Sequence, residues 1–172
     1  GGLTDAHVVA VADMDSDGDL DVISATYTGK VSWHVNDGSP DEAVWTTYEI
    51  ATPTKPTSLF PIDMDYDGDI DIVSSAETGS STNGKVRWYV NDGTPDDGWT
   101  TKNIASSINR PFSTFVADID GDGNLDVVSA AFAGDEIAWY ENSGAAIPEF
   151  SNILMPIFSV LAIIGLNYGR RH

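Results

Sequence analysis

The sequence repeats itself three times, and this repeat constrains the fold more than any other feature. The copies read DMDSDGDLDVI at residues 13–23, DMDYDGDIDIV at residues 63–73 and DIDGDGNLDVV at residues 118–128. Each is followed by a run with a tryptophan at one fixed position, which is Trp33, Trp88 or Trp139. A period of about 50 residues indicates a repeat architecture in which each unit forms one supersecondary structure.

Each unit contains short runs typical of β-strands. In the first unit they cover residues 8–12, 20–25, 30–35 and 45–50, are rich in Val, Ile, Trp, Tyr and Thr, and are separated by Gly, Asp, Asn and Pro. No apolar stripe of helical period occurs before residue 150, which excludes a βαβ fold. Repeated four-stranded units predict an all-β fold of β-propeller blades, with an irregular β-sandwich as the alternative.

The repeat also predicts the domain organisation. We expect three blades at about residues 1–52, 53–107 and 108–143, a linker at 144–149 and a tail at 150–172. Closed propellers usually have about 4 to 8 blades, so we expect these three to belong to a larger propeller. The chain begins with Gly-Gly rather than Met, so we also expect a longer parent protein with any export signal upstream.

The third unit is shorter than the other two. It stops after the strand that ends at Asn142, whereas the first two units continue to a Trp-Thr-Thr strand. We therefore expect the missing outer strand to come from the far N-terminal part of the parent chain.

The repeated aspartate loop is the candidate metal site. Carboxylates occupy positions 1, 3, 5 and 9, with glycine at position 6. The candidate ligands are Asp13, Asp15, Asp17, Asp19 and Asp21 in the first loop, Asp63, Asp65, Asp67, Asp69 and Asp71 in the second, and Asp118, Asp120, Asp122, Asn124 and Asp126 in the third. Crowded carboxylates repel one another unless a cation lies among them. Calcium suits such a set of oxygens better than magnesium, which demands a tighter octahedral geometry.

Two details refine this prediction. Position 7 changes from Asp to Asn in the third loop, so its backbone carbonyl is the expected ligand. An EF-hand is excluded because position 12 holds Ser24, Ser74 or Ser129 instead of glutamate, and strands rather than helices are expected on both sides. Solvated acidic turns are the alternative to a metal site.

These loops, together with the Trp-Tyr strand that follows them, resemble the FG-GAP and VCBS repeats of integrin α-like propellers and microbial surface proteins. The resemblance covers about residues 6–142. It implies a β-propeller with one calcium ion per loop, about three in this chain, on the hairpin between the first two strands of each blade. The side chains at positions 1, 3, 5 and 9 would be ligands. The Phe-Gly and Gly-Ala-Pro elements of the family name are not visible, which favours the microbial subgroup.

The sequence does not indicate an enzyme. It has no GxSxG, HExxH or P-loop motif and no cysteine nucleophile. His34 departs from the repeat, but it aligns with Tyr89 and Tyr140 and is expected to fill a structural aromatic position. The repeated tryptophans are expected to pack between blades. The alternative function is a fragment of a secreted propeller enzyme acting on polysaccharide, with its catalytic residues upstream.

Charge and cysteine content exclude other classes. The chain has 27 Asp and Glu against 8 Lys and Arg, for a net charge of -19. Such a surface repels phosphate backbones, so nucleic acid is not an expected partner. Without cysteine there can be no disulfide framework, and bound metal ions would act as structural clips instead.

The C-terminal tail differs from the repeats. The 20 residues between Glu149 and Arg170 carry no charge, which is just long enough for a membrane-spanning helix over 150–169. The order Pro148-Glu149-Phe150, apolar segment, basic end resembles the PEF-type C-terminal sorting signals of prokaryotic surface proteins, which implies processing by an exosortase-like enzyme at these residues. An ordinary tail anchor is the alternative. We therefore expect a cell-surface protein that is anchored by its tail and binds a protein or glycan ligand.

Overall fold

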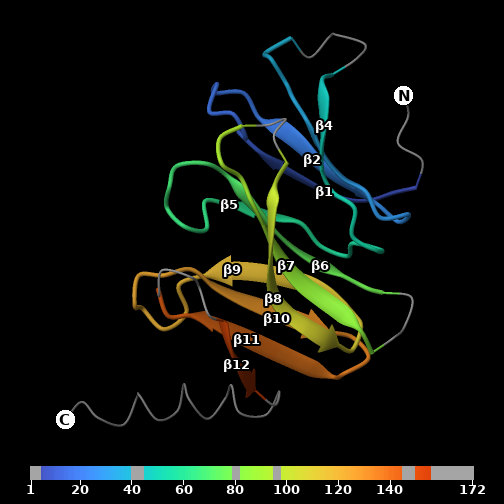
Figure 1. Ribbon diagram of the computed structural model, residues 1–172, viewed down its shortest axis with the longest axis vertical. Helices are drawn as coiled ribbons and strands as arrows, with labels where there is room; N and C mark the ends of the chain where they lie inside the picture. The colour runs from blue at the N-terminus through green and yellow to red at the C-terminus, as the bar shows by residue number, and fades with distance from the viewer. Residues whose placement is uncertain (1–4, 40–44, 79–81, 95–97, 145–149, 156–172) are drawn as a thin grey trace, which may run out of the picture.

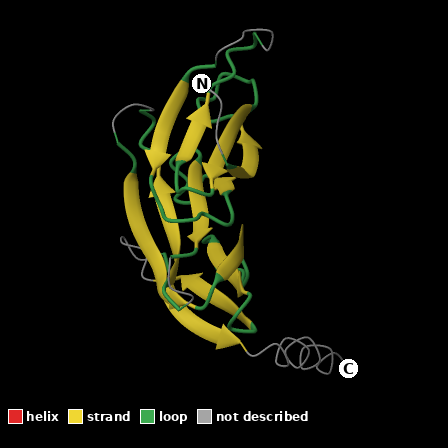
Figure 2. Cartoon of the chain, turned by 90° about the vertical axis from the view of Figure 1, so that its right-hand side faces the viewer, coloured by secondary structure: helices red, strands yellow, loops and turns green. Residues whose placement is uncertain are grey.

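The computed structural model describes residues 5–39, 45–78, 82–94, 98–144 and 150–155, and side-chain positions up to residue 144. These residues form twelve strands and no helix. The strands make three separate four-stranded antiparallel sheets, as expected for propeller-like repeats. The all-β prediction is therefore confirmed for the described residues. The sheets follow one another along the long axis of the molecule (Figures 1 and 2).

Each sheet is formed by four strands that are consecutive in the chain, and we call it a blade. Blade 1 contains β1 (Ala6–Ala12), β2 (Asp21–Thr26), β3 (Val31–His34) and β4 (Thr47–Ala51). Blade 2 contains β5 (Phe60–Ile62), β6 (Asp71–Ala76), β7 (Gly84–Val90) and β8 (Thr100–Ile108). Blade 3 contains β9 (Pro111–Ala117), β10 (Asp126–Ala131), β11 (Glu136–Asn142) and β12 (Phe150–Met155).

The outer strand of blade 3 differs from the sequence expectation. Strand β12 pairs with β11 from Asn142↔Phe150 to Ile137↔Met155, so this chain itself occupies the fourth position of the sheet. The residues that form it were expected to begin the apolar tail, and the strand was expected to come from elsewhere. Of the predicted PEF-like motif, Pro148 and Glu149 lie outside the described residues, as do the rest of the expected helix, 156–169, and the basic end, 170–172.

Two apolar clusters hold the blades together, and each combines opposite faces of adjacent blades. Side chains alternate across a strand, so each blade has two faces. The face that carries the repeated tryptophan, which we call the Trp face, includes Ile23, Val31 and Trp33 in blade 1. It packs against the other face of blade 2, which we call the Tyr face and which includes Ile72 and Tyr89.

The same packing recurs between blades 2 and 3. Val73, Val86 and Trp88 of the blade 2 Trp face join Val127 and Tyr140 of the blade 3 Tyr face. Trp33 and Trp88 are 1% and 0% exposed, which confirms that these two tryptophans pack between blades. Burial of such large side chains is a major source of stability in a fold made of thin sheets.

Candidate metal centres

Each aspartate loop connects the first two strands of its blade. In each loop three carboxylates offer oxygen atoms that lie within 4.8 Å of one another. The groups are Asp13, Asp15 and Asp17 in blade 1, Asp63, Asp65 and Asp67 in blade 2, and Asp118, Asp120 and Asp126 in blade 3. Positions 1, 3 and 5 therefore converge in the first two loops, and the position 9 aspartate, which the sequence also predicts as a ligand, is not part of either group. In the third loop position 9 replaces position 5.

The position 1 carboxylate fixes the curvature of the loop. The amides of Asp17 and Gly18 donate to Asp13 at 3.1 and 3.0 Å, and the second loop repeats both bonds at Asp63. The glycine at position 6 has a positive φ of 98° in the first loop, 102° in the second and 92° in the third. Glycine adopts this conformation without a Cβ clash, so its presence at position 6 is required by the turn.

The third loop closes slightly differently. Asp118 accepts from Gly121 at 2.7 Å and from Gly123 at 3.1 Å, so its first bond spans three residues instead of four. Position 4 has a positive φ in all three loops, and only the third has glycine there; Ser16 and Tyr66 hold it with φ of 60° and 61°. A non-glycine residue in this region is strained.

The position 9 aspartates do not lie open to solvent. Asp21, Asp71 and Asp126 are each 0% exposed. Asp21 accepts from the amide of Met14 at 3.0 Å, from the indole of Trp33 at 2.8 Å and from the amide of Asn36 at 2.7 Å. This carboxylate therefore joins the loop, the third strand and the turn after it, a role that the sequence alone did not reveal.

The partner of position 9 is an asparagine at or just after the end of the third strand of each blade. The backbone amides of Asn91 and Asn142 donate hydrogen bonds to the Asp71 and Asp126 carboxylates at 2.7 and 2.8 Å. The backbone amide of Asn36 makes the same bond in blade 1. Their side chains also donate to the carbonyl of the residue before that aspartate. The asparagine occurs at the same place in all three units, and this repetition was the feature that could have identified it.

The side chain at position 7 points toward the turn that follows this asparagine. A Cβ on Gly38 would lie 2.7 Å from an Asp19 oxygen, and a Cβ on Gly93 would lie 2.9 Å from an Asp69 oxygen. Neither aspartate belongs to the converging groups, and Asn124 packs in the same way in the third loop. The backbone contribution of position 7 to a metal site stays a prediction.

The charged forms of several loop carboxylates are disfavoured. Burial, followed by the Asp21 and Asp17 carboxylates, raises the pKa of Asp15. Burial and then Asp67 raise the pKa of Asp65. Burial raises the pKa of Asp71 to about 7, although the Asn91 and Met64 amides oppose the shift. A cation among these oxygens would favour the ionised forms, and the donor set of carboxylate and carbonyl oxygens fits a hard cation such as calcium.

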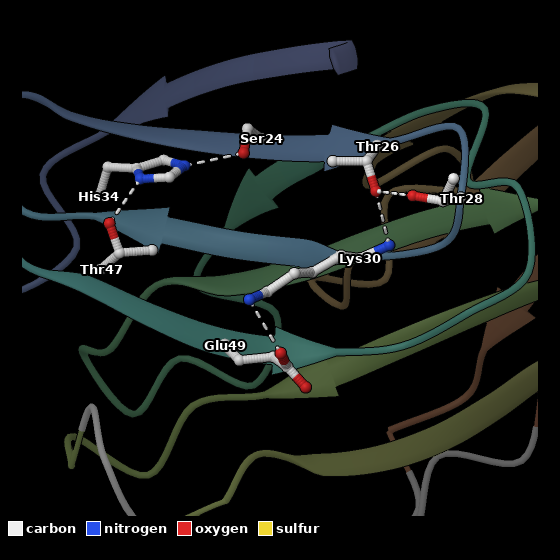
Figure 3. Close-up of polar contacts among 7 residues, drawn as sticks. All are labelled: Ser24, Thr26, Thr28, Lys30, His34, Thr47 and Glu49. Carbon is white, nitrogen blue, oxygen red and sulfur yellow. Dashed lines mark hydrogen bonds and ion pairs between the residues drawn. The ribbon is translucent and has the colours of Figure 1, made fainter. Parts of the chain in front are cut away.

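His34 shows no catalytic arrangement. Its ring lies between Ser24 and Thr47, with Nε2 2.8 Å from the Ser24 hydroxyl and Nδ1 2.9 Å from the Thr47 hydroxyl (Figure 3). In blade 3 the hydroxyl of Tyr140 makes the equivalent contact with Ser129 at 3.2 Å. His34 therefore fills the position of the repeated tyrosine, as expected from the sequence. Burial, with a smaller effect of Lys30, lowers its pKa.

Comparison with known proteins supports the repeat assignment. The model of the FG-GAP-like repeat matches residues 6–74 and 75–129, which together include all three aspartate loops. No curated protein matches the chain. Among the described residues, no helix is long and apolar enough to cross a membrane.

Proposed function

Because the chain belongs to the family of FG-GAP-like repeats, we propose that it is a calcium-binding, propeller-like module that binds a protein or glycan ligand outside the cell and has no catalytic role of its own. The observation that carries this proposal is the convergence of three carboxylates in each of three equivalent loops. About three calcium ions would then bind, one per loop.

In this proposal calcium acts as a structural clip. A cation held by positions 1, 3 and 5 of the first two loops would hold together the first half of a loop that already depends on hydrogen bonds to the position 1 carboxylate. Binding to the folded chain alone stabilises it by mass action. This mechanism would replace disulfides, because the chain has no cysteine. A rigid loop edge could then present side chains to a ligand.

Calcium stoichiometry is the direct test. Equilibrium dialysis of the metal-free chain, followed by elemental analysis, should give about three calcium ions per chain. The Asp65→Asn variant should bind one ion fewer, because it removes a converging carboxylate of the second loop. Asp69→Asn is the matched control, because the third loop already has Asn124 at this position. Unchanged stoichiometry in Asp65→Asn would contradict the ligand assignment.

Attachment to the cell surface through the tail is part of the proposal, and strand β12 places a condition on it. With Phe150–Met155 in the sheet, the uncharged residues that remain before Arg170 are 156–169, fewer than the about 20 that a spanning helix needs. A helix over 150–169 would therefore require β12 to leave blade 3. Blade 3 and the membrane would therefore compete for Phe150–Met155.

Liposome flotation tests this attachment. The full chain should float with vesicles, and the Leu161→Asp variant should remain in solution, because a charge at the centre of an apolar segment opposes insertion. Amide hydrogen exchange in β11 should become faster in the floated protein if β12 leaves the sheet. Failure of the full chain to float would refute attachment through the tail but would leave the calcium proposal unaffected.

A further inference from the structure

The outer strands of blades 1 and 2 differ at one position that faces the repeated tryptophan. The Trp-Thr-Thr run of each outer strand is followed by Tyr48 in blade 1 and by Lys102 in blade 2. In the sheets Tyr48 pairs with Trp33, and Lys102 pairs with Trp88 at the same place. Blade 2 therefore carries a positive charge on its Trp face where blade 1 carries an aromatic ring.

The half-buried side chain of Lys102 is held against the tryptophan. Its Nζ lies 3.9 Å from the centroid of the Trp88 ring, and Trp88 is 0% exposed. In blade 1 the Tyr48 ring packs on Trp33 instead, with centroids 5.5 Å apart and planes tilted by 46°. A cation over an indole ring is attracted by the negative face of the ring. The ammonium of Lys102 therefore has a defined position on the Trp face.

This position lies beside the aspartate loop of the same blade. In blade 1, Trp33 and the position 3 carboxylate of Asp15 line the same small cavity. The repeat places Trp88 and Asp65 in the same relation in blade 2. Because the ammonium of Lys102 stands over Trp88, it is brought close to position 3 of the second loop.

The electrostatic surroundings of the two position 3 carboxylates differ accordingly. Burial and then Asp67 raise the pKa of Asp65, and the positive charge of Lys102 acts in the opposite direction. Burial also raises the pKa of Asp15, but in the described part of the chain every charge that acts on it belongs to a carboxylate. Without metal, the first loop is a set of like charges, whereas the second loop already has one cation beside it.

We propose that Lys102 is a counter-cation of the second loop and makes this loop a weaker calcium site than the first. In the metal-free chain its ammonium partly neutralises the loop carboxylates, and the same ammonium repels a divalent ion that enters the loop. Tyr48 places no such charge beside the first loop. This inference rests on the proposed calcium sites, because it concerns the difference in affinity between two of them.

Unequal affinities would separate the roles of the two blades. A divalent and a monovalent cation about 8 Å apart in water repel enough to weaken binding about fivefold. The first loop would then already be filled at a calcium concentration at which the second loop is still partly empty. Blade 2 would respond to changes in calcium over a range in which blade 1 stays loaded.

Single-loop variants of the full chain make the two affinities measurable by calcium titration calorimetry. Asp15→Asn/Asp120→Asn leaves the second loop intact, and Asp65→Asn/Asp120→Asn leaves the first. Adding Lys102→Tyr to the former should tighten calcium binding about fivefold. Adding Tyr48→Lys to the latter should weaken binding about fivefold. Because the two exchanges shift the affinity in opposite directions, a general loss of folding cannot imitate both.

Two control variants separate the position of the charge from its presence. Lys102→Arg keeps the charge and should keep the weak affinity of the second loop. Lys85→Gln removes one positive charge from β7 at the end away from the loop, where Lys85 pairs with Ala76. This change should alter the affinity less than about twofold at about 0.1 M salt, because exposed charges farther apart than the Debye length are largely screened.

Salt distinguishes charge from packing. The effect of Lys102→Tyr should shrink to less than about twofold at about 1 M salt, where the Debye length is about 3 Å. Tighter binding that persists unchanged at this salt would come from packing on Trp88 and would overturn the inference. If the second loop binds calcium equally well with Lys102 and with Lys102→Tyr, the inference fails and the proposed function stands. If neither single-loop variant binds calcium, both are overturned.

Discussion

Replacing Asp21 by alanine tests the role that the structure assigns to position 9. This buried carboxylate accepts hydrogen bonds from the Met14 amide, the Trp33 indole and the Asn36 amide. A buried donor left without a partner costs about 1–3 kcal/mol. Three such donors amount to about 3–9 kcal/mol, and because neighbouring losses are not additive we expect at least about 3 kcal/mol of destabilisation.

Urea unfolding of the metal-free chain, followed by tryptophan fluorescence, measures this loss. With an m-value of about 2 kcal/mol/M, a loss of about 3 kcal/mol lowers the midpoint by about 1.5 M. Metal-free conditions are needed because they separate the hydrogen bonds from any ligand role of the carboxylate.

Asp19→Asn is the matched control, since it changes an exposed carboxylate two residues away to the side chain found at Asn124. It should alter stability by no more than about 0.5 kcal/mol. If Asp21→Ala were as stable as this control, the carboxylate would not join the loop to the third strand and the reasoning would be refuted.

Three further predictions concern single positions. Gly84→Ala should lower the free energy of unfolding by about 1–3 kcal/mol, because a Cβ there would clash with the ring of Pro111. Gly134→Ala is the control and should change stability little, because its Cβ would lie 3.4 Å from its nearest neighbour. Equal urea midpoints for the two variants would argue against the contact with Pro111. Tyr66→Gly should raise the free energy of unfolding by about 0.5–1 kcal/mol, because it relieves the positive φ of an exposed residue. A lower Tm in thermal unfolding would contradict the inference that Tyr66 is strained. Burial and a nearby lysine lower the pKa of His34 below 6.5, so the unfolded chain binds a proton that the folded chain does not. Stability should therefore fall as the pH drops below about 6.5, and the His34→Tyr variant should lose that part of the slope; an unchanged slope would show that His34 does not cause it.

The repeated elements of the fold were predictable because they depend on local sequence. The strand runs, the glycine at position 6 and the convergence of positions 1, 3 and 5 in the first two loops all follow from residues within one short segment. The tryptophan positions were equally clear, since three copies at the same register indicate a shared packing site.

Two features were not predictable, each for a physical reason. The role of Asp21 depends on donors up to 15 residues away, and the spacing of carboxylates within a loop contains no information about them. Strand β12 was assigned to the tail because an uncharged apolar run favours a membrane helix and an outer strand alike. Only the free edge of β11 decides between these outcomes, and that edge is a tertiary feature.

Thermal unfolding of the full chain, in millimolar calcium and again with a chelator, tests the central claim most directly. Each site saturated at 100 times its dissociation constant adds about 2.7 kcal/mol, and each kcal/mol raises the Tm of a chain this size by about 2–4 °C. The account predicts a clear rise in Tm with calcium and a smaller one with magnesium. A folded chain whose Tm is the same with calcium and with chelator would show that the loops are acidic turns without a metal, and would contradict the account.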